Sequence, residues 1–177
     1  MTALPLIDCT IAQNEKLLLK LMTSKDSSLF ADLYCSERVM TYISHPVERR
    51  KISNSFNKAI AFNSDSFIKR CFIVIFSKFF GCDVGITGYT VFESEKEVEV
   101  GVMLLENFQS KNFAFETLSL LISLVIERYP DYCVVANLDH RNAPALNLVQ
   151  RLGFDCIVDG KFALDNQKFL NAMINFD

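Results

Sequence analysis

The feature that most constrains this chain is a strand, a short turn and a helix in direct succession over residues 97–128. Residues 97–105 first alternate and then become apolar, which predicts a strand that starts half-exposed and ends buried. The next segment predicts a helix, because Ala114, Leu118, Leu121, Ile122 and Val125 form one apolar stripe. Such a turn can bind an anion, since the first N–H groups of a helix have no partner inside it. Plain strand–turn–helix units are also common in α/β folds, so the unit alone does not assign a function.

The same criteria divide the rest of the chain into short strands and helices. Helical spacing predicts helices after Thr23, after Pro46 and from Asn142 to Gly153, where Thr23 and Asn142 are suitable N-caps. Asp159-Gly160 is either a hairpin turn or a bulge in one long strand. The resulting order, βααβββαβαββ, predicts a mixed α/β sheet. Apolar runs predict the strands at residues 16–21, 71–76, 84–92, 98–105, 132–138, from 154 and at 168–176.

Length and composition favour one globular domain over residues 1–177. We expect this domain to be a monomer or homodimer. The net charge of −3 argues against nucleic-acid binding by charge alone. The six cysteines include no C-x-x-C pair and no His cluster accompanies them, which argues against a zinc site and favours a reducing cytoplasm. No apolar run approaches the ~18 residues of a membrane span. We therefore expect a cytoplasmic protein without a metal, a membrane partner or a nucleic-acid partner.

The turn segment Gln109-Ser110-Lys111-Asn112-Phe113-Ala114 resembles the pyrophosphate loop of the GNAT acetyltransferases. The family pattern is Arg or Gln, Gly, any residue, Gly, any residue, then Gly or Ala. Gln109 and Ala114 match, whereas Ser110 and Asn112 stand where the family has its internal glycines. Five other segments resemble, in the right order, the GNAT branch that acetylates ribosomal-protein N-termini: residues 15–20 (EKLLLK), 36–43 (SERVMTYI), 85–88 (GITG), 99–102 (EVGV) and 142–154.

This resemblance implies a GNAT fold in which two neighbouring central strands, 98–105 and 132–138, splay apart and hold acetyl-CoA between them. The backbone of Met103 and Leu104 would bind the pantetheine arm as an added strand does. The backbone N–H groups of residues 109–114 would bind the pyrophosphate, with Lys111 as a nearby charge or as an ordinary solvated side chain. Asn137 and Asn142 are either further cofactor contacts or, respectively, a turn residue and a helix cap.

The expected chemistry is transfer of an acetyl group to an amine, for which a carboxylate can act as the base. Glu99 is the candidate, with Glu97 two residues earlier on the same strand face as a substitute. The alternative is that Glu99 is an ordinary surface residue paired with a lysine. The Tyr or Ser that many GNAT enzymes use to protonate the leaving thiolate is absent, since Val149 and Ala145 occupy those positions.

Three functions follow from the resemblance. The first is an acetyl-CoA-dependent N-acetyltransferase acting on an amine, with a protein N-terminus as the first candidate acceptor. The second is a GNAT module that binds CoA or a protein partner without turnover, and the third is acetylation of a small molecule such as an antibiotic or polyamine. Hydrolase chemistry is disfavoured, because nothing pairs His45 or His140 with a nucleophile.

Overall fold

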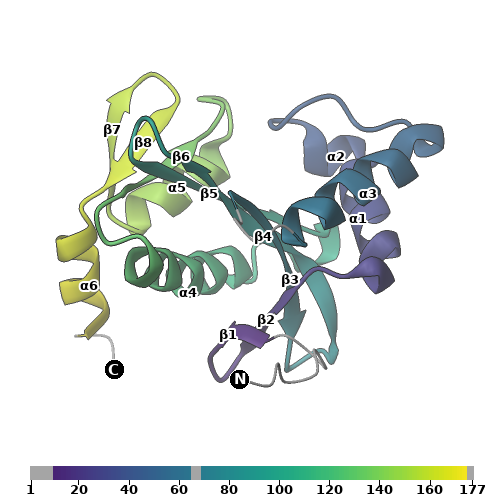
Figure 1. Cartoon of the computed structure of the whole chain (residues 1–177), viewed down its shortest axis with the longest axis horizontal. Helices are drawn as coiled ribbons and strands as arrows, with labels where there is room; N and C mark the ends of the chain where they lie inside the picture. Colours follow the sequence, from purple (N-terminus) through teal and green to yellow (C-terminus); the bar gives the residue numbers. More distant parts are fainter. Residues whose placement is uncertain (1–9, 65–68, 175–177) are drawn as a thin grey trace.

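The computed structural model describes residues 10–64 and 69–174, which form one mixed sheet of eight strands with helices on its faces (Figure 1). The strand order is β1-β2-β3-β4-β5-β6-β8-β7, and among the strands of the described residues only the β5–β6 pair is parallel. The strands are β1 Thr10–Gln13, β2 Leu17–Leu21, β3 Arg70–Ser77, β4 Cys82–Phe92, β5 Glu97–Leu104, β6 Cys133–Asn137, β7 Phe154–Val158 and β8 Lys161–Leu164. The helices are α1 Ser27–Tyr34, α2 Glu37–Met40, α3 Ile52–Asn63, α4 Phe113–Arg128, α5 Ala143–Arg151 and α6 Asn166–Ile174, with 3₁₀ turns η1 Ser24–Asp26, η2 Arg49–Lys51 and η3 Glu106–Phe108.

The two faces of the sheet carry separate apolar clusters, because successive strand residues point to opposite sides. On one face α4 buries Leu121 against a cluster that includes Val98. On the other face α1 and α3 bury Phe30 and Phe56 against a cluster that includes Val74. Figure 1 shows α1, α2 and α3 gathered on one side of the sheet and α4 on the other. Alternate residues of β5 therefore face either α4 or the α1–α3 group.

Several local predictions are confirmed. A capping box joins Thr23 and Asp26 at the start of η1, and the Asn142 side chain accepts a hydrogen bond from the Ala145 N–H at 3.2 Å. β3 and β4 pair as the expected hairpin. Within β4, a Cβ added at Gly88 would collide with a backbone carbonyl oxygen of β3, so this position requires glycine. Asp159-Gly160 is the turn of the β7–β8 hairpin, which resolves the alternative left open by the sequence.

The prediction of a strand over residues 168–176 is wrong. Residues 166–174 form helix α6, in which Phe169 is buried and Leu170 and Met173 pack against the same core. Their spacing of one and three residues is helical, and the Asp165 carboxylate accepts a hydrogen bond from the Lys168 N–H at 3.0 Å at the start of the helix. The final strand is β8, which takes the free edge of β6.

Two short elements were not predicted, β1 and α2. Both have few residues, and β1 is held by pairing with β2 instead of by a strong pattern of its own. Residues 1–9, 65–68 and 175–177 lie outside the described residues; they include Cys9, part of the predicted polar turn at 63–70 and the end of the predicted final strand.

Candidate functional site

The parallel strands β5 and β6 separate after a short paired segment, as the splayed-strand prediction requires. They pair only at Glu97↔Cys133, Val98↔Val134 and Glu99↔Val135. Beyond these positions β5 continues to Leu104, paired on its other edge with β4. The far half of β5 therefore has an open edge facing the end of β6.

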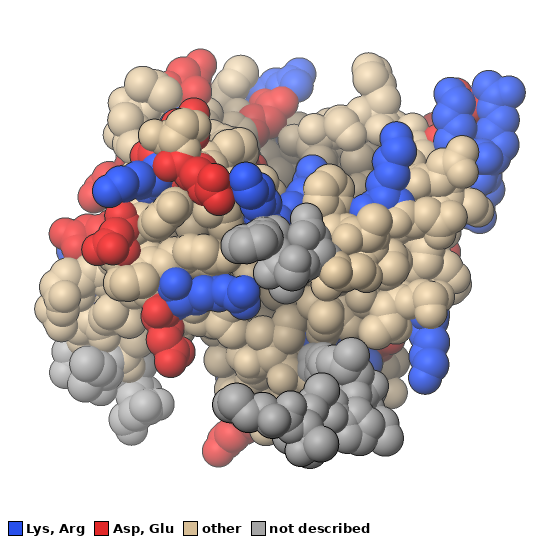
Figure 2. All heavy atoms as spheres, viewed as in Figure 1, with Lys and Arg blue, Asp and Glu red and all other residues tan. Residues whose placement is uncertain are grey.

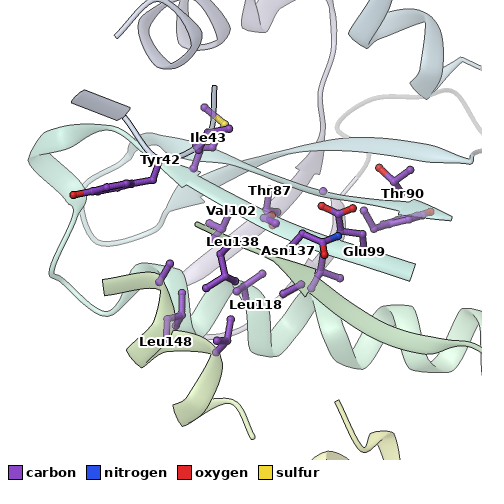
Figure 3. A pocket seen from close by; sticks show the side chains of 18 of the residues that line it. Tyr42, Ile43, Thr87, Thr90, Glu99, Val102, Leu118, Asn137, Leu138 and Leu148 are labelled. Carbon is purple, nitrogen blue, oxygen red and sulfur yellow. The ribbon is translucent and has the colours of Figure 1, made fainter. Parts of the chain in front are cut away.

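Two adjoining cavities follow this opening. A cavity of about 800 Å³ is lined by β3, β4, β5, the end of β6 and α5, and Figure 3 shows its lining. A second cavity of about 520 Å³ lies at the turn before α4. Residues on both linings, including Tyr42, Met103 and Asn142, connect the two into one groove. Ten predicted site residues line the groove: Glu99, Met103, Leu104, Gln109, Ser110, Asn112, Phe113, Ala114, Asn137 and Asn142.

The register of β5 decides which backbone groups face the opening. The Leu105 N–H donates to the Val84 carbonyl, so odd-numbered residues of β5 form the hydrogen-bonded pairs with β4. Met103 therefore directs its backbone groups at β4, whereas the backbone groups of Val102 face the gap. Leu104 keeps its predicted orientation toward the gap, although its carbonyl already accepts a hydrogen bond from the Gln109 side chain at 3.2 Å.

In the loop before α4, the two residues that stand at the family's glycine positions have the left-handed backbone conformation. Ser110 has φ 60° and Asn112 has φ 65°, both in the left-handed region that favours glycine. Asn112 is the N-cap position of α4, yet its side chain does not cap the helix; it contacts Glu116 and Arg151 instead. The first N–H groups of α4 consequently lack a side-chain cap and can donate hydrogen bonds to an anion.

One lysine of the loop and two arginines from neighbouring helices supply the cations in this region. Lys111 lies over the rings of Phe80 and Phe108, with Nζ 5.0 and 5.6 Å from their centroids, and does not line either cavity. Arg38 and Arg151 line the loop cavity. Arg151 lies over the Phe115 ring at 4.6 Å and donates to the Asn112 side chain at 3.2 Å. No local sequence pattern indicates either arginine, because only the packing of α2 and α5 around the loop brings them there.

The two candidate carboxylates have different surroundings. Glu97 forms a part-buried ion pair with Lys161, whose Nζ lies 2.6 and 2.7 Å from its two carboxylate oxygens. Glu99 lines the larger cavity, and no cation of the described residues pairs with it. Figure 3 shows Glu99 on the cavity wall together with Asn137 from β6 and Thr90 from β4. The lysine pairing that we considered for Glu99 thus belongs to Glu97, and Glu99 is the carboxylate available to a ligand.

The helix after β6 supplies no proton donor at the positions considered. Val149 is buried in the core and Ala145 lines both cavities. Asn142 caps α5 and lies on both linings, so the capping interpretation is confirmed and a ligand contact is also compatible.

Charge is unevenly distributed on the face that Figure 2 shows. Lys and Arg side chains are prominent at the end formed by α3, and Asp and Glu side chains lie mainly toward the opposite end. No group of three His, Cys, Asp or Glu suited to a metal ion occurs within residues 10–64 and 69–174. In the same part of the chain, every helix is too short or too polar to cross a membrane.

Comparison with known proteins agrees with this architecture. The family model of the acetyltransferase (GNAT) domain matches residues 16–155. No curated protein matches by sequence. Among solved structures, the spermidine N-acetyltransferase from Vibrio cholerae in complex with CoA and spermine is 16% identical, with a TM-score of 0.74 over 89% of this chain and 100% of that one.

Two further structures share the fold. The ribosomal L7/L12 alpha-N-protein acetyltransferase RimL is 13% identical, with a TM-score of 0.72 over 92% of this chain and 97% of that one. A GNAT-family acetyltransferase from Bacillus anthracis is 17% identical, with a TM-score of 0.71 over 88% of this chain and 98% of that one. The splayed strands, the loop before α4 and the match over most of the chain lead to one conclusion: this chain belongs to the GNAT acetyltransferase family.

Proposed function

We propose that residues 1–177 form one acetyl-CoA-dependent N-acetyltransferase domain that transfers an acetyl group to an amine. The observation that carries the proposal is the continuous groove from the uncapped start of α4, along the open edge of β5, to the unpaired Glu99. An anion site, a strand edge and a base are thus arranged in the order that an acetyl-CoA molecule and an amine would need.

The residues of the groove fit acetyl-CoA, which would supply the activated acetyl thioester. The N–H groups at the start of α4, with Gln109, Ser110, Asn112, Phe113 and Ala114, would bind the pyrophosphate. The backbone groups of Val102 and the N–H of Leu104, which face the gap, would bind the pantetheine arm by adding a strand to β5. Arg151 adds positive charge at the same end, whereas Arg38 forms an ion pair with Glu106 at 3.1 Å. Asn137 and Asn142 provide side-chain amides beside the open gap.

Glu99 would act as the general base. A protonated amine cannot attack a carbonyl, and a lysine-type amine has a pKa near ~10.4 in water. A carboxylate in the acceptor cavity attracts the ammonium form and accepts its proton directly or through water as the new C–N bond forms. The backbone N–H groups at the β5 edge would stabilise the developing charge on the carbonyl oxygen. Solvent would protonate the thiolate that leaves, because Val149 and Ala145 cannot.

Two classes of amine are candidate acceptors. A protein N-terminal amine is the first candidate, and the fold shared with RimL supports it; the fold shared with the spermidine enzyme supports a small amine equally. The free state of Cys35, Cys71, Cys82, Cys133 and Cys156 supports a reducing, cytoplasmic location.

Calorimetry with acetyl-CoA, with desulfo-CoA and ATP as comparators, tests the cofactor site. Micromolar affinity for acetyl-CoA and none for ATP is the expected result. Absence of binding at millimolar ligand would overturn the acetyltransferase proposal. Binding without turnover of any acceptor would instead support a non-catalytic CoA-binding module, an alternative that the missing thiolate acid favours.

The role of Glu99 is tested by Glu99→Gln, with Glu97→Gln as the matched control, because both changes replace a carboxylate by its amide on the same strand face. We expect Glu99→Gln to lower kcat/KM by roughly 100-fold or more near neutral pH. The deficit should shrink as the pH rises toward the pKa of the acceptor amine, because solvent then removes the proton. Equal activity of Glu99→Gln and the wild type across this range would remove Glu99 from the role of base.

A further inference from the structure

The larger cavity contains a cation on the same sheet face as Glu99. In the register of the sheet, Arg70 of β3 lies opposite Thr90 of β4, which lies opposite Glu99 of β5. Residues two apart on a strand share a face, so Arg70 faces the same side as Phe72 and Val74, which belong to the α1–α3 cluster. Thr90 and Glu99 face that side too, because they are paired with Arg70 across the strands. Arg70, Thr90 and Glu99 all line the cavity, so one cross-strand row places a guanidinium and a carboxylate two strands apart in it.

Aromatic rings hold Arg70 in place, and no carboxylate neutralises it. Its guanidinium carbon lies 5.9 Å from the centroid of Phe62 and 5.1 Å from that of Phe72. No acidic side chain of residues 10–64 and 69–174 forms an ion pair with it. The Tyr34 phenol also lines the cavity; burial raises its pKa, and the charge of Arg70 partly offsets that rise. An arginine stacked on rings keeps its donors directed at a ligand, because its planar fork is already oriented.

The sheet surface beside the Arg70–Thr90–Glu99 row is open. The row next to Arg70–Thr90–Glu99 contains Gly88 and Gly101, which face each other across β4 and β5. A Cβ placed on Gly101 would meet nothing within 4 Å. The floor of the cavity beside Glu99 is therefore backbone, which leaves room for an acceptor to lie along the sheet.

The other acidic groups on the lining do not reproduce this arrangement. Asp139 is held by Arg141, with Nη2 to carboxylate oxygen at 2.6 Å, and its pKa lies below its usual range because of these hydrogen bonds. Asp159 lies in the β7–β8 turn past the end of β6, and it is not part of the Arg70–Thr90–Glu99 row. Within the described part of the chain, Arg70 and Glu99 are thus charges on the cavity lining that share one sheet face and form no ion pair.

We propose that the acceptor of this enzyme is an amine whose own molecule carries an anionic group, which Arg70 binds while Glu99 receives the amine. This inference rests on the proposed function. Two strand spacings separate the Cα atoms of Arg70 and Glu99 by about 10 Å. An acceptor of that reach is an aminocarboxylic acid of several methylene groups or a peptide N-terminus followed closely by an acidic residue. A polyamine would bring a second ammonium toward Arg70 and bind less well.

The test measures equilibrium binding, so it does not depend on turnover. Dissociation constants are determined by ligand-observed NMR for aminohexanoate, aminohexanamide and diaminohexane, with the free protein and with the protein saturated with CoA. A second pair of probes consists of short peptides that differ only in Asp or Asn at their second position. These arms separate a small acid from an acidic N-terminus as the source of the anionic group.

We expect at least one anionic probe to bind tenfold or more tightly than its neutral partner. Arg70→Gln should reduce this ratio to about one, and Arg70→Lys, which keeps the charge, should retain most of it. A wild-type ratio near one, tightest binding of diaminohexane, or an unchanged ratio in Arg70→Gln would each overturn the proposal. Failure of the acetyl-CoA titration would overturn the proposed function instead, and the two failures are therefore distinguishable.

Discussion

Ser110 stores backbone strain in the loop before α4, and replacing it with glycine should release that strain. Its φ of 60° lies in the left-handed region, where a side chain costs on the order of 1–2 kcal/mol. Glycine removes this cost but makes the unfolded chain more flexible, which costs about 0.4–1 kcal/mol. The difference predicts that Ser110→Gly raises the free energy of unfolding by roughly 0.5–1 kcal/mol, which corresponds to a rise in Tm of about 1–4 °C for a chain of this size.

The assay is thermal unfolding followed by circular dichroism, with urea midpoints as a second measure. Ser53→Gly is the matched control, because Ser53 is exposed in α3 and has ordinary helical geometry. There the same substitution should lower the stability by roughly 0.5 kcal/mol. If Ser110→Gly lowers Tm as Ser53→Gly does, the loop is not strained at Ser110 and the argument from its φ angle is refuted.

Two further predictions concern the cavity floor and one buried thiol. Gly101→Val should raise the acceptor KM tenfold or more without lowering Tm or weakening acetyl-CoA binding, because its side chain enters open space on the Glu99 face; an unchanged KM would place the acceptor elsewhere. Burial raises the pKa of Cys71 from 9.0 to about 11, so above pH 9 the unfolded thiol ionises first and stability falls until about pH 11. Between these pH values the wild type should lose about 1–3 kcal/mol more than Cys71→Ala in urea unfolding, and parallel curves would contradict the raised pKa.

The strand–turn–helix unit could be predicted from sequence because its signals are local. The alternation in β5, the apolar stripe of α4 and the Asn142 cap depend on residues a few positions apart, and the structure has all of them. The same local reasoning was wrong for α6, where an apolar run was interpreted as a strand. Phe169 and Met173 pack on the core from one face of a helix, and β8 already occupies the edge of β6 that a further strand would have used.

Pairing between distant segments, by contrast, was decided by the tertiary structure. Glu97 and Glu99 are equivalent in sequence, yet only Glu97 meets Lys161, which lies 64 residues away. The β4–β5 register directs the backbone groups of Met103 at β4 and leaves those of Val102 facing the gap.

The charge arrangement of the groove likewise required the fold. Arg151 reaches the loop only through the docking of α5, and the Arg70–Thr90–Glu99 row exists only when three strands align. Local patterns by themselves determined most of the helices and strands, because periodicity and capping act within a few residues of the chain. The resemblance of short segments to the GNAT family supplied the fold family and the candidate base. Only the tertiary structure decided which charges are neutralised and which remain free for a ligand, because sheet register and helix packing bring together residues that the sequence keeps far apart.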